Sequence, residues 1–320
     1  MRLFKGLAIV VLTACVSTAF AQQRLSIATG GTGGTYYPYG GGLAELIGEH
    51  IDGYSAVAEV TGASVENMGL IHRGDSDLAI ALADTVHAAY RGSGPFEGRQ
   101  VAKVRALASI YPNAVQIVTL ADSGIESLAD LEGKRVSVGA PGSGTEVNAR
   151  TVLEANGITY DQFEPHRLNF NETADALRDG DIDAGIWSVG PPTSSIINLA
   201  TTRDIRLVAL TDEEIGNAIE AEPVLASYTL RKGIYEGVEE PVKTVSVPNV
   251  LTVNADMSED LAYQITKVLF EQTQALIDIH PAANDTTVEF SLNSTPVPFH
   301  PGALRYYEET GQEVPEKLRP

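Results

Sequence analysis

The chain has 320 residues, of which 43% are hydrophobic, and a formal net charge of −20. This length can bury a large core and favours two domains. The acidic balance argues against a nucleic-acid partner, whose phosphates would be repelled, and against adhesion to an anionic lipid surface. A small anionic ligand is not excluded, because a local set of backbone N–H groups can outweigh distant, screened charges.

The first 21 residues have the pattern of a secretory leader. Arg2 and Lys5 supply positive charge, residues 7–14 form an apolar run, and residues 19–21 (AFA) fit a small-residue cleavage site. The apolar run is shorter than the roughly 18–20 residues needed to span a bilayer. We therefore expect cleavage after Ala21 and a periplasmic mature protein that begins at residue 22.

Cys15 is the only cysteine of the chain. Residues 12–15 (LTAC) resemble a lipoprotein cleavage box, so the alternative to cleavage after Ala21 is a lipid anchor through Cys15. Cleavage after Ala21 would leave the mature protein without cysteine, so its core and hydrogen bonds must stabilise it without disulfides. A cysteine-based metal site or redox centre is excluded.

Short strands and helices alternate through the mature chain, which predicts an α/β fold with mostly parallel strands. In the first part of the chain, Asp84 is expected to cap a helix. The expected strands there are 25–28, 54–60, 78–82, 104–110 and 114–119, and the expected helices are 39–51, 63–73 and 84–91.

The same alternation continues to the C-terminus. Thr193 or Ser194 should cap a helix that runs to residue 200, after two prolines that blur its start. Further helices are expected at 146–156, 173–179, 212–221 and 258–277, with a short docking helix in the tail at 295–310. Further strands are expected at 135–138, 184–186, 205–209, 226–230, 244–247 and 250–253.

Two glycine-rich loops, 29–37 (TGGTGGTYY) and 139–145 (GAPGSGT), each lie between a strand and a helix. Glycines let main-chain N–H groups approach a ligand, and the start of a helix adds unpaired donors and partial positive charge. Two such loops suggest two half-sites that face each other around an anion, although each loop could also be a tight turn without a ligand. Neither loop matches a nucleotide-binding motif, because the lysine of the P-loop and the third glycine of the dinucleotide fingerprint are both missing.

The dipeptide Pro-Asn occurs at 112–113 and again at 248–249, each time after a strand pattern. We interpret these two sites as crossovers between lobes. Lobe 1 would then combine residues 22–113 with 250–320, and lobe 2 would comprise residues 114–249. The alternative is a coincidence of two turn dipeptides.

Five segments, taken together with the leader, carry a family resemblance. They are GGTGGTYYPYG, DLAIALADTVHAAYRG, SLADLEGKRVSVGAPGSGT, GPPTSSIINLA and TPVPFHPGALRYYEETG. In this combination they resemble the TAXI family, the exported solute receptors of TRAP-type transporters. The resemblance covers nearly the whole mature chain and implies a type II periplasmic-binding-protein fold, with two α/β lobes joined by crossover strands.

The resemblance also implies a function without catalysis. A receptor of this kind binds a small anionic solute, such as glutamate or a C4–C5 dicarboxylate like 2-oxoglutarate, between its lobes. It then delivers the solute to TRAP membrane subunits, here expected as a fused permease. No cofactor and no metal are expected, and we expect a monomer.

By the same resemblance, the glycine loops and one further helix start should line the site. Hydroxyl and main-chain N–H donors would hold a carboxylate there, and each hydrogen bond to a charged group contributes about 1.5–3 kcal/mol. No arginine lies in these motifs, which departs from the arginine-clamped branch of TRAP receptors. The residues expected in the site are Gly33, Gly34, Thr35 and Tyr36 from lobe 1, Gly142, Ser143, Gly144 and Thr145 from lobe 2, and Thr193 and Ser194 from the later helix start.

Three further candidates have two interpretations each. Asp84 either caps its helix only or points into the cleft, where it could bind an ammonium group and favour glutamate over a plain dicarboxylate. Tyr111 either stacks on the ligand or fills a lobe. Trp187, which follows a strand, belongs either to the core or to the cleft wall.

Two other functions remain open from the sequence. An ABC-type receptor for a sulfonate or a thiamine-precursor-like ligand would share the architecture. An exported hydrolase or transferase would use Ser143, but no adjacent base is visible in the sequence and a lone serine is a poor nucleophile. The six histidines show no metal-binding spacing, and residues 179–183 (DGDID) lack the later glutamate of a calcium loop.

Overall fold

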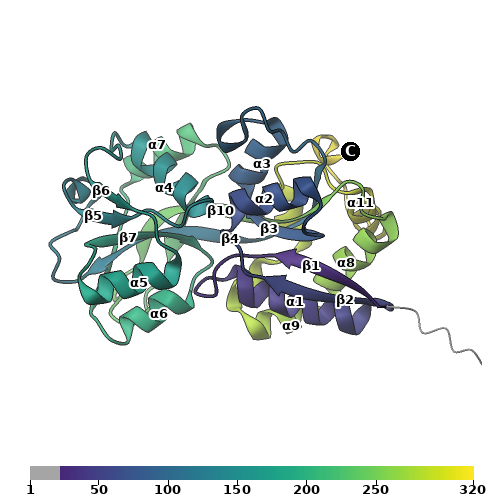
Figure 1. Cartoon of the computed structure of the whole chain (residues 1–320), viewed down its shortest axis with the longest axis horizontal. Coiled ribbons are helices and arrows are strands. Elements are labelled where there is room, and N and C mark those ends of the chain that lie inside the picture. The colour runs from purple at the N-terminus through teal and green to yellow at the C-terminus, as the bar shows by residue number, and fades with distance from the viewer. Residues whose placement is uncertain (1–21) are drawn as a thin grey trace, which may run out of the picture.

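The computed structural model describes residues 22–320, so the expected leader and Cys15 lie outside the described residues. Ten strands form one sheet, in which eight follow the order β2-β1-β3-β10-β4-β7-β5-β6, while β8 pairs with β4 and β9 pairs with β10. Helices cover both faces of the sheet (Figure 1). No helix within residues 22–320 has the length and apolar character needed to cross a membrane.

The first half of the molecule, on the right in Figure 1, is built on parallel strands. Strand β1 pairs in parallel with β2 and β3, and every residue of β3 is buried, as expected for a strand covered on both faces. Its strands are β1 (Gln23–Ala28), β2 (Tyr54–Glu59) and β3 (Leu78–Leu82), and its helices are α1 (Tyr36–His50), α2 (Ser64–Arg73), α3 (Ala83–Arg91), α8 (Glu259–Glu271), α9 (Thr273–Ile279), α10 (Val288–Ser294) and α11 (Pro301–Glu309).

The second half, on the left in Figure 1, repeats this arrangement. Strand β5 pairs in parallel with β6 and β7, and helices again lie on both sides. Its strands are β5 (Arg135–Ser137), β6 (Glu164–His166), β7 (Ala184–Val189), β8 (Ile205–Val208) and β9 (Ala226–Leu230), and its helices are α4 (Gly144–Ala155), α5 (Phe170–Asp179), α6 (Ser194–Ala200) and α7 (Asp212–Ala221).

Two long strands, β4 (Val104–Leu120) and β10 (Val242–Asn254), run through both halves and pair in antiparallel fashion. We expected each of them as two separate strands interrupted at Pro-Asn, and that expectation was wrong. Pro112 lies opposite Pro248, and the register shifts between Pro248 and Val250. Proline lacks an N–H group, so a bulge at this pair interrupts the ladder locally without ending either strand. The exact lobe boundaries stay a prediction.

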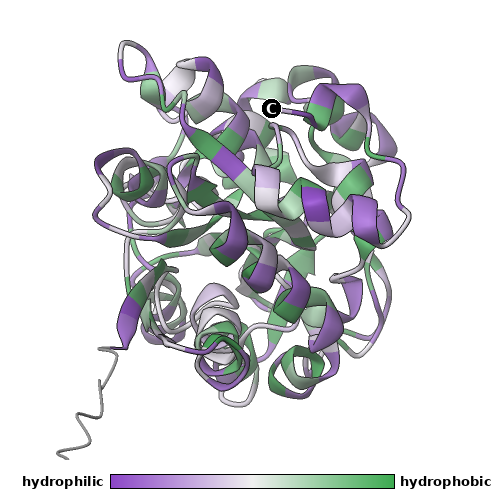
Figure 2. Cartoon of the chain, turned by 90° about the vertical axis from the view of Figure 1, so that its right-hand side faces the viewer, coloured by the Kyte–Doolittle hydropathy of each residue, from purple (hydrophilic) through white to green (hydrophobic). Residues whose placement is uncertain are grey.

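The buried apolar side chains form two clusters. The larger cluster extends from Leu25 to Leu318 and includes residues of both halves, and the smaller one surrounds Trp187 in the second half. Seen from the end of the first half, the central strands are mostly hydrophobic, while hydrophilic residues alternate along the surrounding helices (Figure 2). The two glycine loops follow β1 and β5, and both strands contribute buried residues to the larger cluster. The core therefore fixes the position of each loop.

Candidate functional site

A cavity of about 240 Å³ lies between the two halves. The first half contributes residues 30–31, 34–36 and 60–64, together with Leu82 at the end of β3 and Asn113 in β4. The second half contributes residues 140, 143–145, 169–170 and 188–189. The two glycine loops predicted from the sequence therefore face one common cavity.

Four helices begin at this cavity. The first residues of α1, α2, α4 and α5 are Tyr36, Ser64, Gly144 and Phe170, and all four line it. The first N–H groups of a helix have no partner within the helix, and each helix start has a partial positive charge. Two of these helices belong to each half, so the positive ends of helices from both halves lie at the cavity.

Local sequence explains why the helices start here. The Oγ atom of Ser143, the N-cap of α4, accepts a hydrogen bond of 3.1 Å from the N–H group of Glu146. Asn169 caps α5 in a capping box with Glu172, which satisfies donors at both ends of the motif. Gly139 has a φ of +100°, a conformation that favours glycine, and an added Cβ would lie 2.8 Å from Thr145.

The cavity lining is uncharged. Within residues 22–320, its walls consist of glycine, hydroxyl, amide, aromatic and aliphatic residues, without a lysine, arginine, histidine or carboxylate. No three His, Cys, Asp or Glu side chains in this part of the chain are grouped so that they could hold a metal ion. Recognition of an anion would therefore depend on neutral donors and helix dipoles.

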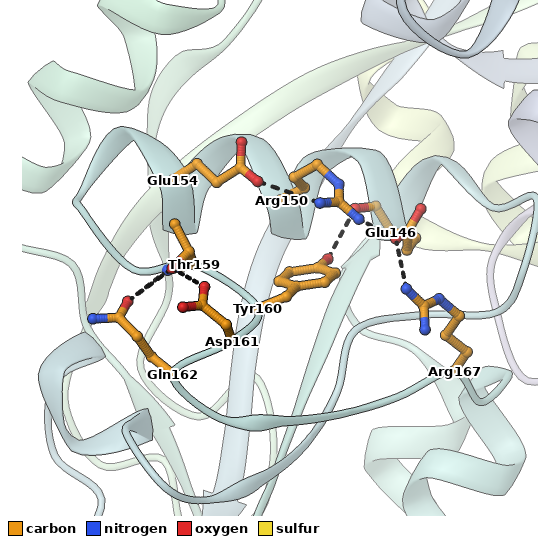
Figure 3. Close-up of polar contacts among 8 residues, drawn as sticks. All are labelled: Glu146, Arg150, Glu154, Thr159, Tyr160, Asp161, Gln162 and Arg167. Atoms are coloured by element: carbon orange, nitrogen blue, oxygen red, sulfur yellow. Dashed lines mark hydrogen bonds and ion pairs between the residues drawn. The ribbon is translucent and has the colours of Figure 1, made fainter.

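Arg150 and Arg167 of the second half both pair with Glu146 on α4 (Figure 3). Arg150 contacts Oε1 of Glu146 at 3.0 Å and lies over the ring of Tyr160, 4.2 Å from its centroid. Arg167 lies 3.8 Å from the same Glu146 oxygen. Neither arginine lines the cavity, although Thr145 does.

Six of the predicted site residues line the cavity. They are Gly34, Thr35, Tyr36, Ser143, Gly144 and Thr145. Their role in binding stays a prediction, but the structure does bring these two sequence-distant groups together.

The remaining predicted residues do not line the cavity. Gly33 and Thr193 join the two halves instead, because the Thr193 hydroxyl donates to the Gly33 carbonyl at 3.0 Å. The Gly142 carbonyl likewise accepts from the backbone of α2. Ser194 is exposed to solvent and lies outside the cavity lining, and its role in binding stays a prediction.

Two aromatic candidates belong to the interior. Trp187 is fully buried, and its Nε1–H group donates to Ser195 Oγ at 3.1 Å. Trp187 does not line the cavity, but Phe170, which does, stacks on it at a centroid distance of 6.1 Å. Tyr111 is also fully buried and packs against Tyr39 at 5.1 Å, so the core interpretation fits both residues.

Asp84 is not the N-cap of its helix, which was a wrong prediction. Helix α3 begins at Ala83, and Leu82 occupies the cap position. The buried Asp84 carboxylate accepts from the N–H group of Thr85 at 2.7 Å and from Nδ2 of Asn148 at 2.6 Å. Burial raises the pKa of Asp84 to about 6, and the charge of Glu222 adds to this rise. The bond to Asn148 joins α3 of the first half to α4 of the second.

The Asp84–Asn148 pair continues into the cavity wall. The Ser188 hydroxyl donates to Oδ1 of Asn148 at 2.7 Å, and Ser188 lines the cavity. Asn113 also lines the cavity, and its Nδ2 donates to the Ser188 carbonyl at 2.9 Å.

The crossover strands complete this buried network. Asn249 donates to Oδ1 of Asn113 at 2.7 Å, and the Tyr36 hydroxyl donates to Oδ1 of Asn249 at 2.5 Å. Sequence reasoning used Asn113 and Asn249 only as crossover markers and did not recognise Asn148 or Ser188. The one available signal was the position of Asn148, three residues after Thr145 on the same helix.

The opposite side of the cavity is also bridged. The Thr35 hydroxyl donates to the Gly190 carbonyl at 2.7 Å, and Nε2 of His280 lies 3.0 Å from the Pro192 carbonyl. Hydrogen bonds between the halves thus occur on both faces of the sheet, and the cavity lies between them.

Comparisons with known proteins agree with this architecture. The model of the NMT1-like family matches residues 27–311. A solved structure from Bordetella bronchiseptica RB50 is similar with a TM-score of 0.54 and 17% identity, covering 93% of this chain and 91% of that one. The ligand-binding component of an ABC-type import system from Staphylococcus aureus, solved with zinc bound, has a TM-score of 0.53 and 11% identity, covering 93% and 97%. These likenesses confirm the predicted α/β fold of the periplasmic-binding-protein type.

Proposed function

The chain belongs to the NMT1-like family, and from this premise we propose that it is an exported solute receptor that binds a small anion between two lobes. The observation that carries the proposal is the convergence of four helix starts, two from each half, on one uncharged cavity. Helix starts bind anions through free N–H groups and the helix dipole. Because both halves contribute, the ligand would hold them together.

The proposed ligand is glutamate or a C4–C5 dicarboxylate such as 2-oxoglutarate. The cavity of about 240 Å³ is below the roughly 300–1,000 Å³ of pockets for drug-sized ligands, which favours a small solute. The backbone N–H groups of Gly144 and Thr145, at the start of α4, are donors of the kind that bind carboxylates, and hydrogen bonds to a charged group contribute about 1.5–3 kcal/mol each.

We further propose that closure is the signal that the membrane partner recognises. Lobe 1 would comprise residues 22–113 and 250–320, and lobe 2 residues 114–249. Hinge closure around a ligand is a common motion of such two-lobed receptors, and the register shift at Pro248 in β10 offers a place for it. The proposed partner is a fused TRAP permease, and the receptor would act as a periplasmic monomer.

One observation favours a second candidate ligand class. Val60, Leu82, Phe170 and Val189 add apolar surface to the cavity, which would suit the alkyl part of a sulfonate in an ABC-type receptor. An enzyme is not proposed. The Ser143 hydroxyl caps a helix, and among residues 22–320 no basic side chain or carboxylate lines the cavity to activate it.

A thermal-shift panel tests the proposal. L-Glutamate, 2-oxoglutarate, succinate and an alkanesulfonate are each added at 100-fold excess over the dissociation constant, where binding stabilises the folded state by about 2.7 kcal/mol. For a chain of about 300 residues, that corresponds to a midpoint rise of roughly 4 °C. Native mass spectrometry of freshly purified protein identifies any ligand retained from the cell. A shift with the sulfonate alone favours the ABC-type alternative, and no shift with any anion contradicts both.

A further inference from the structure

The wall of the cavity at Ser188 has a defined hydrogen-bond polarity, and it originates at a carboxylate that does not touch the cavity. Asp84 is 5% exposed and does not line the site. Its Oδ1 atom accepts from both the N–H group and the hydroxyl of Thr85, and its Oδ2 atom lies 2.6 Å from Asn148. An ionised carboxylate only accepts hydrogen bonds. The amide of Asn148 must therefore turn its NH₂ group toward Asp84.

This orientation determines the next contact in the chain. With its NH₂ group on Asp84, Asn148 presents its carbonyl oxygen to Ser188, which is 4% exposed. The Ser188 hydroxyl has one proton, and it donates that proton to Asn148 at 2.7 Å. Only the lone pairs of Ser188 Oγ then remain for a ligand in the cavity.

We propose that Asp84, acting through Asn148, holds Ser188 as a hydrogen-bond acceptor toward the cavity, so that the site selects an anionic solute with a donor group there. An ammonium or a hydroxyl group beside the carboxylate satisfies Ser188, whereas a carbonyl oxygen at the same place faces lone pairs and stays unpaired. Sites that hydrogen-bond a substrate group discriminate strongly against analogues that cannot pair. This inference rests on the proposed function and deepens it, because it separates 2-amino and 2-hydroxy acids from 2-oxo acids.

The substitution Asp84→Asn reverses the polarity. The carbonyl oxygen of the new side chain stays with the donors of Thr85, so its NH₂ group faces Asn148. The Asn148 amide then turns over, presents its NH₂ group to Ser188, and releases the Ser188 proton to the cavity. Asp84 is a positioning residue in this scheme, and the readout is selectivity rather than affinity.

The test measures dissociation constants by calorimetry at pH 8 for L-glutamate, 2-hydroxyglutarate and 2-oxoglutarate, which differ only at carbon 2. At this pH Asp84 is ionised, since burial raises its pKa only to about 6. The wild type is expected to prefer the amino and hydroxy acids over the oxo acid by at least tenfold. Asp84→Asn is expected to lower that ratio at least tenfold, and Ser188→Ala to bring it close to one.

Asp77→Asn is the matched control. It makes the same charge change in the same half, but the Asp77 carboxylate accepts from the backbone and hydroxyl of Ser26 and lies outside the cavity lining. Its selectivity ratio should stay within twofold of the wild-type ratio.

The outcomes separate this inference from the proposed function. If the wild type binds none of the three acids, both are wrong. If it binds 2-oxoglutarate as tightly as the other two, the inference is wrong and the receptor function stands. Equal weakening of all three ligands by Asp84→Asn also overturns it, since that is the effect of a structural role. If Asp84→Asn does not fold, Ser188→Ala decides, because an unchanged ratio contradicts the scheme and a lost ratio supports it.

Discussion

Gly144→Ala separates closure of the two halves from folding. Gly144 is the first residue of α4 in the second half, and it faces Leu82 and Ser64 of the first half. A Cβ atom there would lie 2.5 Å from Leu82 Cδ1 and 2.7 Å from Ser64 Oγ. The three nearest atoms all belong to Leu82 and Ser64, so the closest clashes of the methyl group lie between the halves. We expect it to act against the closed arrangement only.

The expected loss of affinity follows from this overlap. Overpacking a well-packed contact costs about 1–3 kcal/mol, and the cost applies to the closed, ligand-bound state. Since each 1.4 kcal/mol is a factor of ten in the dissociation constant, ligand binding should weaken roughly 5- to 150-fold. The empty protein should keep its thermal midpoint, because alanine is a better helix former than glycine.

Calorimetry and small-angle scattering measure the two effects. Gly144→Ala should bind weakly and stay extended at ligand concentrations that close the wild type. Gly216→Ala is the control, because it is a helical glycine of the second half with nothing within 4 Å of the added Cβ. It should bind normally and gain up to about 1 kcal/mol of stability. Wild-type affinity in Gly144→Ala, or a large loss of stability in its empty form, would refute the reasoning.

Three further predictions concern pH, capping and fluorescence. Between pH 4 and pH 7, the stability of the wild type should fall by about 2 kcal/mol relative to that of Asp84→Asn. The folded pKa of about 6 lies above the ordinary 3.8, so stability is lost as the pH rises from the ordinary pKa through the folded one. A pH-independent difference between the two proteins in urea titrations contradicts this. Ser143→Ala should lower stability by about 1 kcal/mol through loss of the cap on Glu146, whereas unchanged urea midpoints would show that the cap is unimportant. The fluorescence emission of Trp187, the single tryptophan, should change on ligand binding, because Phe170 of the cavity lining stacks on it. This change should disappear in Phe170→Leu. An equal change in the variant contradicts the link between Phe170 and Trp187.

The local features of the site were predictable from the sequence. Glycine loops, a helix-capping serine and the alternation of strands and helices depend on neighbouring residues, so short segments determine them. The six residues around Thr35 and Ser143 that line the cavity are all of this kind. The Pro-Asn pairs meet where Pro112 of β4 lies opposite Pro248 of β10. Local propensity suggested breaks there, but pairing with neighbouring strands keeps each strand continuous.

The sequence by itself therefore determined an α/β chain with two helix starts suited to binding an anion. Each of them consists of a glycine loop and the first residues of a helix, which are consecutive in the chain. Only the tertiary structure decided what lies between them. Asp84, Asn148 and Ser188 come from three elements and from both halves, and no spacing in the chain reveals that they meet. Their contacts depend on how α3, α4 and β7 pack across the crossover strands, and burial among these elements converts an expected helix cap into the acceptor end of a hydrogen-bonded chain.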